Sequence, residues 1–348
     1  MVKTLRGLKL SRLRPWQVPQ LTPIEQQFVD RHDVRTDLAF EAHQVASQAG
    51  QHALPGVTTQ VEDLGFAQVT RIHIETDLGA AAMGKAKGRY VTIQAPGLKR
   101  RDRTLEQQVS EVLASEIEQY LKRWQIGPDQ PVLVVGLGNW NATPDNVGPL
   151  TVSKLLVTRH LYEYQALNEE ILGKMRPLAA LSPGVLGLTG VETAEIVQGV
   201  VERVRPALVI CVDALASMSV ERIGTTIQVA DAGISPGSGV GNTRRGLNRE
   251  TLGVPVLAMG VPTVIYATTI VSEAVDQLLT SIAAPIYPLD AESRRNLIRE
   301  VLGESMGTLV VTPKEVDVMV ESISDILADG LNEALHPGIS AQEAAAIR

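Results

Sequence analysis

The sequence is poor in several residue types, and each scarcity excludes a class of protein. Cys211 is the single cysteine among 348 residues, so an intramolecular disulfide and a cysteine-based zinc site are excluded and a reducing compartment is favoured. Aromatic residues make up only 3%, so Val, Leu, Ile and Ala must build the core. Basic residues number 32 against 39 acidic ones, which argues against a direct nucleic-acid partner. No apolar run approaches the roughly 20 residues that span a bilayer, so we expect no membrane partner.

The first 37 residues differ in charge from the rest of the chain. They carry seven basic and four acidic residues, a net charge of +3, whereas the remainder carries 25 basic and 35 acidic residues, a net charge of −10. A secretory signal would need an apolar segment after the basic residues, and none follows Leu10. Residues 1–37 are therefore either a solvated tail or a detachable basic segment lying on an acidic body.

The hydrophobic pattern predicts an α/β fold. Residues 56–98 alternate in the manner of short strands, whereas 132–135 and 207–212 are continuous apolar runs, typical of strands buried on both faces of a parallel sheet. Thr104 and Thr312 are the predicted N-caps of two helices, and residues 263–282 form an amphipathic segment. We expect a mostly parallel sheet with helices on both faces, of the phosphorylase/hydrolase-like kind, plus a small β-rich addition. The expected parts are listed by residue: β-rich addition about 56–98, α/β core about 104–285, and C-terminal helical part about 286–348.

Two aspartates follow the apolar runs. Asp145 lies in the loop after residues 132–135, and Asp213 directly follows residues 207–212. Active groups of such sheets gather beyond the carboxyl ends of the strands. Two neighbouring carboxylates share one proton, so one can activate water while the other protonates a leaving amine. The alternative is that both residues only cap the helices that follow them.

Other motifs argue less strongly for a chemical role. Gly136 and Gly138 follow a predicted strand, but Asn141 replaces the third glycine of a dinucleotide fingerprint. The glycine-rich loop 236–242 could bind an anion through its backbone N–H groups, although it lacks the ending of a P-loop. The histidines show no paired ligand spacing, and Cys211 lies in a buried strand. We therefore expect no metal and no cofactor.

Five long motifs resemble the germination protease family of spore-forming bacteria. They read DLAFEA, GLTGVET, VDALA, GISPGSGVGN and GVPVLAMGVPT, and the resemblance extends from about Val34 to about Ala267. Their positions are 37–42, 187–193, 212–216, 233–242 and 253–263.

The resemblance implies a specific activity. It implies an endopeptidase that degrades small acid-soluble spore proteins during germination, made as an inactive zymogen in the forespore and residing in the spore-core cytoplasm. It also implies a homotetramer and removal of an N-terminal propiece, here residues 1–37. The family is grouped with aspartic-type peptidases and is distantly similar to hydrogenase-maturation proteases. Asp145 and Asp213 match the two proposed catalytic aspartates of the family.

The resemblance also implies a processing site between Asp37 and Leu38. The sequence around this bond is similar to the cleavage sites of the spore proteins, so we expect extended substrates with an acidic residue before the cut. Such a residue needs a hydrogen-bond donor or a cation. Two departures from the family pattern are Tyr266, where an acidic residue is expected, and a longer propiece. The candidate substrate-binding residues are Gly237, Gly239, Gly241, Arg244 and Arg245.

Two other functions remain as alternatives. A metal-dependent processing protease would need a histidine beside the carboxylates, and no histidine follows either aspartate in a comparable loop. A non-enzymatic anion- or peptide-binding module could instead be centred on Gly237–Gly241. A chelator distinguishes the two protease mechanisms, and any cleavage of a spore protein excludes the binding module.

Overall fold

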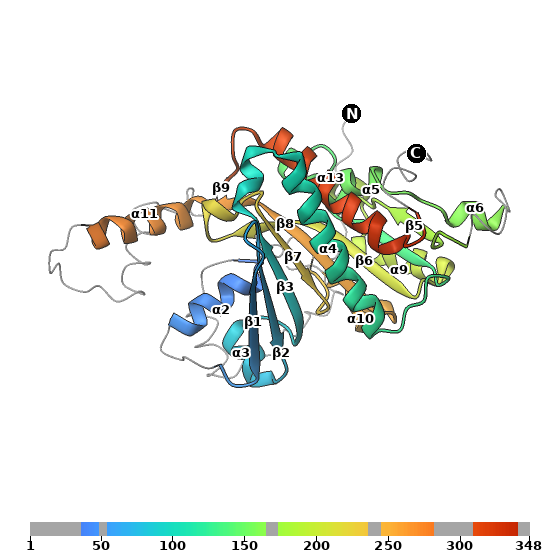
Figure 1. Cartoon of the computed structure of the whole chain (residues 1–348), viewed down its shortest axis with the longest axis horizontal. Helices are drawn as coiled ribbons and strands as arrows, with labels where there is room; N and C mark the ends of the chain where they lie inside the picture. Colours follow the sequence, from blue (N-terminus) through green and yellow to red (C-terminus); the bar gives the residue numbers. More distant parts are fainter. Residues whose placement is uncertain (1–35, 49–53, 165–172, 236–244, 282–308, 340–348) are drawn as a thin grey trace, which may run out of the picture.

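A single sheet organises the molecule (Figure 1). The computed structural model describes residues 36–48, 54–164, 173–235, 245–281 and 309–339. Within them, nine strands occur in the spatial order β1-β2-β3-β7-β8-β6-β4-β5, and β9 pairs with β8. The strands are β1 Val57–Asp63, β2 Gln68–Ile74, β3 Gly88–Gln94, β4 Val132–Gly136, β5 Leu178–Leu181, β6 Leu208–Ser217, β7 Thr226–Ala230, β8 Val256–Tyr266 and β9 Val310–Val311.

The sheet has a parallel part and an antiparallel part. Strands β5, β4, β6 and β8 run parallel to one another, whereas β7, β3, β2 and β1 continue the sheet with antiparallel pairing. The predicted α/β class with a mostly parallel core is confirmed. The strands of the expected β-rich addition join the core sheet directly, because β3 pairs with β7.

Helices cover both faces of the parallel part. Val132 and Val134 of β4 face a core shared with α4, α5 and α13, whereas Leu133 and Val135 face a core shared with α9 and α10. This alternation is what a strand buried on both faces requires. A third core lies between α2, α3 and the strands β2, β3 and β7. The helices are α2 Ala39–Gln48, α3 Asp77–Met83, α4 Arg103–Arg123, α5 Val147–Ser153, α6 Arg159–Glu163, α8 Leu186–Thr189, α9 Thr193–Val204, α10 Arg249–Leu252, α11 Ala267–Ser281 and α13 Val316–Leu335, with 3₁₀ turns η1 Pro96–Arg100, η2 Thr143–Asp145 and η3 Val220–Arg222.

Three predicted boundaries are wrong. Helix α4 is capped by Asp102, whose carboxylate accepts the Thr104 N–H at 2.9 Å. Helix α13 begins at Val316, and the Thr312 hydroxyl instead donates to the carbonyl of Thr263 at 2.9 Å, where β9 meets β8. The segment predicted as amphipathic from residue 263 begins as strand, because β8 continues to Tyr266 before α11 starts. A competing local cap displaces the signal at Thr104, whereas a tertiary contact with β8 overrides the one at Thr312.

Candidate active site

Glycines let the loop that carries Asp145 pack against the end of β4 and the middle of β6. A Cβ atom on Gly148 would lie 2.3 Å from the carbonyl oxygen of Leu137 and 2.4 Å from that of Val212. A Cβ on Gly138, whose φ is +115°, would lie 1.9 Å from the Asp145 carbonyl oxygen. Only glycine permits such close approach and such a backbone angle. The turn η2, which ends in Asp145, is thereby held beside β6.

Asp213 lies on β6, beyond the point at which its neighbour β4 ends. Val212 pairs with Gly136, the last residue of β4, and β6 itself continues to Ser217. The expectation that Asp213 directly follows its strand is therefore wrong, although it does lie past the carboxyl end of β4. Its side chain is buried, with 6% of the residue exposed, and its Oδ1 accepts the Ala214 N–H at 2.9 Å.

Two effects raise the pKa of Asp213 well above its usual value. The larger effect is burial. The second is the negative charge of neighbouring carboxylates, mainly Asp145 and to a smaller extent Asp37. The hydrogen bond from the Ala214 N–H acts in the opposite direction. Asp213 therefore holds a proton at pH values where an exposed aspartate is ionised. A protonated carboxyl group beside an ionised one can act as a pair, with the first as general acid and the second as general base.

A cavity of about 730 Å³ connects these groups. Asp145 and Asp213 both line it, together with Asp37, Lys85 and Gln228. The cavity is large enough to hold several residues of a peptide, because small-molecule sites usually measure about 300–1,000 Å³. The arrangement thus brings both predicted catalytic residues and the predicted processing residue to one site.

The chain segment at the predicted processing bond forms part of the wall of this cavity, through Thr36 and Asp37. The Asp37 N–H donates to the carbonyl of Ala216 at 3.1 Å, and the Asp37 carboxylate accepts the Ala216 N–H at 2.8 Å. Beyond Gly136, β4 no longer covers this edge of β6, so the backbone of Ala216 is available to an added segment. Leu38 is fully buried and precedes α2. The segment is bound much as an extended peptide would be.

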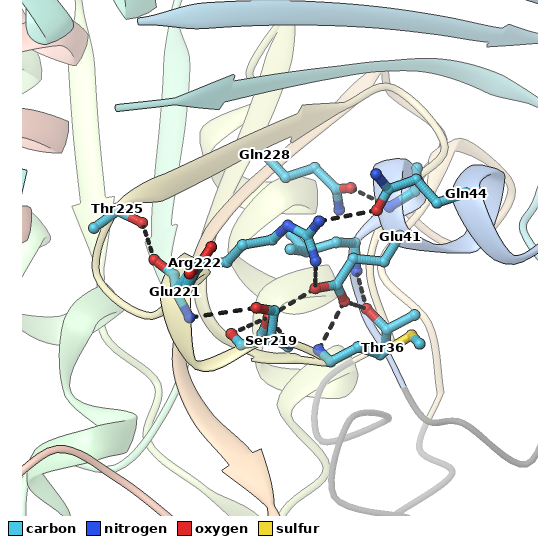
Figure 2. Close-up of polar contacts among 12 residues, drawn as sticks. Thr36, Glu41, Gln44, Ser219, Glu221, Arg222, Thr225 and Gln228 are labelled. Carbon is cyan, nitrogen blue, oxygen red and sulfur yellow. Dashed lines mark hydrogen bonds and ion pairs between the residues drawn. The ribbon is translucent and has the colours of Figure 1, made fainter. Parts of the chain in front are cut away.

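A second buried carboxylate, Glu41, anchors the segment from α2 (Figure 2). Its oxygens accept hydrogen bonds from Arg222 Nη1 at 2.7 Å, Ser217 Oγ at 2.8 Å and the Met218 N–H at 2.8 Å. The Thr36 hydroxyl also donates to Glu41. Glu41 thereby ties the start of α2 to the end of β6, and the residues before α2 are held at the wall of the cavity.

Lys85 is a partly buried cation that interacts electrostatically with Asp37. Its Nζ donates to the Thr36 carbonyl at 2.9 Å, and burial lowers its pKa while the charges of Asp37 and Glu41 oppose that effect. Lys85 was absent from the sequence-based candidates, because nothing in its local sequence indicates burial. Gln228 was also missed, although a lone amide within the apolar run of β7 is a usable signal.

The remaining sequence-based candidates divide into two groups. Gly237, Gly239, Gly241 and Arg244 lie outside the described residues, and Arg245 is exposed at the edge of that gap, so their substrate-binding role stays a prediction. The Asp37 carboxylate accepts a hydrogen bond from the backbone of Ala216 instead of from any of these candidates that the structure describes.

Cys211 and Tyr266, which the sequence singled out, both lie within strands of the sheet. Cys211 is fully buried and its thiol pKa is raised, first by burial and then by the charge of Asp213, which matches the expected inert core residue. Tyr266 ends β8, where it pairs with Val310. Across the described ranges, no three His, Cys, Asp or Glu side chains group as metal ligands would, and no helix there is long and apolar enough to cross a membrane.

Comparison with known proteins defines the class and then the family. The family model for germination proteases matches residues 34–287 and 282–347. The germination protease of Caldanaerobacter subterraneus subsp. tengcongensis is 47% identical over 320 residues, covering 89% of this chain and 96% of that protein. Those of Clostridium tetani and Bacillus subtilis are 41% and 40% identical, covering 89% and 90% of this chain and 98% and 96% of theirs.

These matches and the carboxylate-lined cavity make the protein a peptidase of α/β fold. The chain belongs to the germination protease family. Its relatives are matched over nearly their whole length, so the activity is a peptide-bond hydrolysis associated with spore germination.

Proposed function

We propose that the chain is an aspartic-type endopeptidase in which Asp145 and Asp213 form the catalytic pair. The observation that carries the proposal is the buried Asp213, whose pKa is raised by burial and by Asp145 in a cavity that Asp37 also lines. The pair shares one proton, which resides mainly on the more deeply buried Asp213. Asp145 is then the base in the resting state.

The reaction follows from this division of roles. Asp145 takes a proton from water as the water oxygen attacks the carbonyl carbon of the residue before the cut. Asp213 supplies its proton to the nitrogen of the leaving amine as the C–N bond breaks. The products are a new carboxyl group and a new amino terminus, and one proton transfer between the carboxyls restores the pair.

The zymogen and the substrate are part of the same proposal. The chain cleaves itself between Asp37 and Leu38, which removes residues 1–37, and the processed protein degrades small acid-soluble spore proteins in the spore core as a homotetramer. The position of Asp37, which lines the cavity and binds Ala216, supports self-cleavage, and the membership of the germination protease family supports the substrate class.

The test is digestion of a small acid-soluble spore protein by the full chain and by two variants, Asp145→Asn and Asp213→Asn. Each variant should retain its fold and lose cleavage by at least about three orders of magnitude, because general acid and base contribute about 10²–10⁴-fold each. Asp77→Asn is the matched control, since the Asp77 side chain is 90% exposed and lies outside the cavity.

Each alternative has its own signature in this assay. Loss of activity with a chelator, and its return with a metal ion, would establish the metal-dependent mechanism instead. Absence of any cleavage by the unaltered chain would favour the binding module. Near-normal turnover by either folded aspartate variant would contradict the catalytic pair.

A further inference from the structure

Gln228 spans the bond at which the chain is proposed to cleave itself. Its Nε2 donates to the carbonyl oxygen of Asp37 at 3.0 Å, and its Oε1 accepts the N–H of Ala39 at 2.6 Å. These two partners flank the Asp37–Leu38 peptide bond, one on the carbonyl side and one a residue beyond the nitrogen. A single carboxamide therefore binds the main chain on both sides of the bond, and Figure 2 shows Gln228 directed to the start of α2.

The sheet holds this carboxamide in a fixed position. Gln228 lies at the centre of β7, paired with Thr92 of β3 on one side and Gly260 of β8 on the other. Its neighbours Ile227 and Val229 face the core that α4 and α13 cover, so Gln228 points to the opposite face. With 8% of the residue exposed, the carboxamide is shielded from water.

The position and burial of the Gln228 carboxamide suit it to stabilise a negative charge that develops on the Asp37 carbonyl oxygen. When water attacks the Asp37 carbonyl carbon, the carbonyl oxygen becomes an oxyanion and its hydrogen bonds strengthen. A donor that is already in place and shielded from water stabilises that charge without reorganisation. Gln228 is the one amide in the buried strand Thr226–Ala230. A buried amide without hydrogen-bond partners would destabilise the fold, so its two main-chain partners account for its presence there.

We propose that Gln228 is a third catalytic residue, which stabilises the oxyanion through Nε2 while its Oε1 fixes the residue two positions after the cut. The inference rests on the proposed function, because it identifies the Asp37 carbonyl as the reacting group. It extends to the processed enzyme: departure of residues 1–37 leaves the Gln228 Nε2 donor without the Asp37 carbonyl, and a substrate carbonyl takes that place.

The experiment measures the first-order rate constant of self-cleavage of the full chain by mass spectrometry. Gln228→Glu keeps the shape and the acceptor oxygen but loses the donor when ionised, so the rate near neutral pH should fall about 10²–10³-fold. As pH falls, the introduced carboxyl gains a proton and donates again, so the rate relative to the unaltered chain should rise. Gln228→Met lacks a donor at every pH and should stay slow throughout.

Thr226→Val is the matched control. Thr226 lies on the same strand, and its buried hydroxyl has no hydrogen-bond partner among the described residues, so the rate should stay within about twofold. Melting temperatures of all variants establish that they fold, and a dilution series establishes that the cut is within one chain.

Three outcomes decide the matter. A pH-dependent deficit in Gln228→Glu together with a pH-independent deficit in Gln228→Met supports the inference. Equal rates for the unaltered chain and the two Gln228 variants, or the same deficit in both variants at all pH values, overturns it and leaves the catalytic aspartates standing. No self-cleavage of the unaltered chain at Asp37–Leu38 overturns the proposed self-processing and this inference with it.

Discussion

Glu41 and Asp213 are both buried carboxylates, yet their surroundings are opposite. Glu41, with 1% of the residue exposed, is bound by the Arg222 guanidinium and by donors from Ser217 and Met218. Asp213, with 6% exposed, has the Ala214 N–H as a donor, and the charges that act on its pKa are those of two further carboxylates. A buried carboxylate is stable only when cations and hydrogen-bond donors replace the lost water. Glu41 has both a cation and several donors, whereas, among the described residues, the Asp213 side chain has one backbone donor and two neighbouring negative charges.

The comparison separates a structural carboxylate from the proposed catalytic one. The compensated charge of Glu41 fixes α2 against β6 and so holds the residues before α2 at the wall of the cavity. The poorly compensated Asp213 retains a proton that it can transfer. Burial alone therefore does not identify a catalytic carboxylate, and the charges of the neighbouring groups do.

The largest expected effect comes from exchanging the two carboxylates for amides. Asp213→Asn should abolish self-cleavage yet raise the free energy of unfolding at neutral pH. The raised pKa of Asp213 means that the native state binds its proton more tightly than the unfolded state, so stability falls as pH rises from about 4 through that raised pKa. Asparagine removes this pH dependence. Thermal unfolding at several pH values measures it, and the two proteins should converge below about pH 3.5.

Glu41→Gln is the matching substitution at the other carboxylate, and it should lower stability while retaining self-cleavage. The amide cannot bind Arg222 as an ion, so stability should fall, while the folded fraction still cleaves itself at a measurable rate. If Asp213→Asn destabilised the protein and Glu41→Gln stabilised it at neutral pH, the distinction between the two carboxylates would be wrong.

The second largest effect is a loss of stability on removal of the Arg222 guanidinium, which pairs with Glu41. Arg222→Leu leaves Glu41 buried without its guanidinium, and it should lower the free energy of unfolding by about 3 kcal/mol. Urea unfolding measures the change. Arg159→Leu is a suitable control, because Arg159 pairs with the half-exposed Glu163 on the short helix α6 and should change stability by less than about 1 kcal/mol. Equal changes in the two variants would contradict a structural role for the Glu41–Arg222 pair.

The third effect concerns the charge of the residue before the cut. Asp37→Asn keeps an acceptor for the Ala216 N–H but removes the negative charge near Lys85, and it should slow self-cleavage about tenfold. In a chain that already carries Lys85→Met, the same substitution should have less than about a twofold effect. Rates of the four proteins form a double-mutant cycle. A cycle without coupling would assign recognition of the charge to other groups, such as the predicted Arg244 and Arg245.

The sequence predicts the parts of the site that depend on strand patterning. The apolar runs place Asp145 and Asp213 near the carboxyl end of a parallel sheet, and both line the cavity. The same pattern did not show that β6 continues past Asp213, because the charged residue interrupts the apolar run, although apolar residues follow it. An N-cap signal at Thr312 failed because the hydroxyl bonds across to β8.

The groups that bind the segment before α2 were not predictable from local sequence. Glu41 and Arg222, and likewise Asp37 and Gln228, lie more than 175 residues apart in the chain and meet only through the sheet order. Lys85 reaches Thr36 from the end of α3, and its burial depends on that packing. The proposed processing bond comes from the resemblance to the family, and the tertiary fold supplies the groups that bind the chain on both sides of it.

The most direct test of the account is the intact mass of the full chain followed over time at about pH 5.5 and about pH 7.5, beside Asp145→Asn. The account predicts release of residues 1–37, a new amino terminus at Leu38 and a faster reaction at the lower pH, because Asp213 must hold its proton. Asp145→Asn should keep its full mass. Cleavage of Asp145→Asn at the same rate, or processing of the unaltered chain at a bond other than Asp37–Leu38, would contradict the central claim.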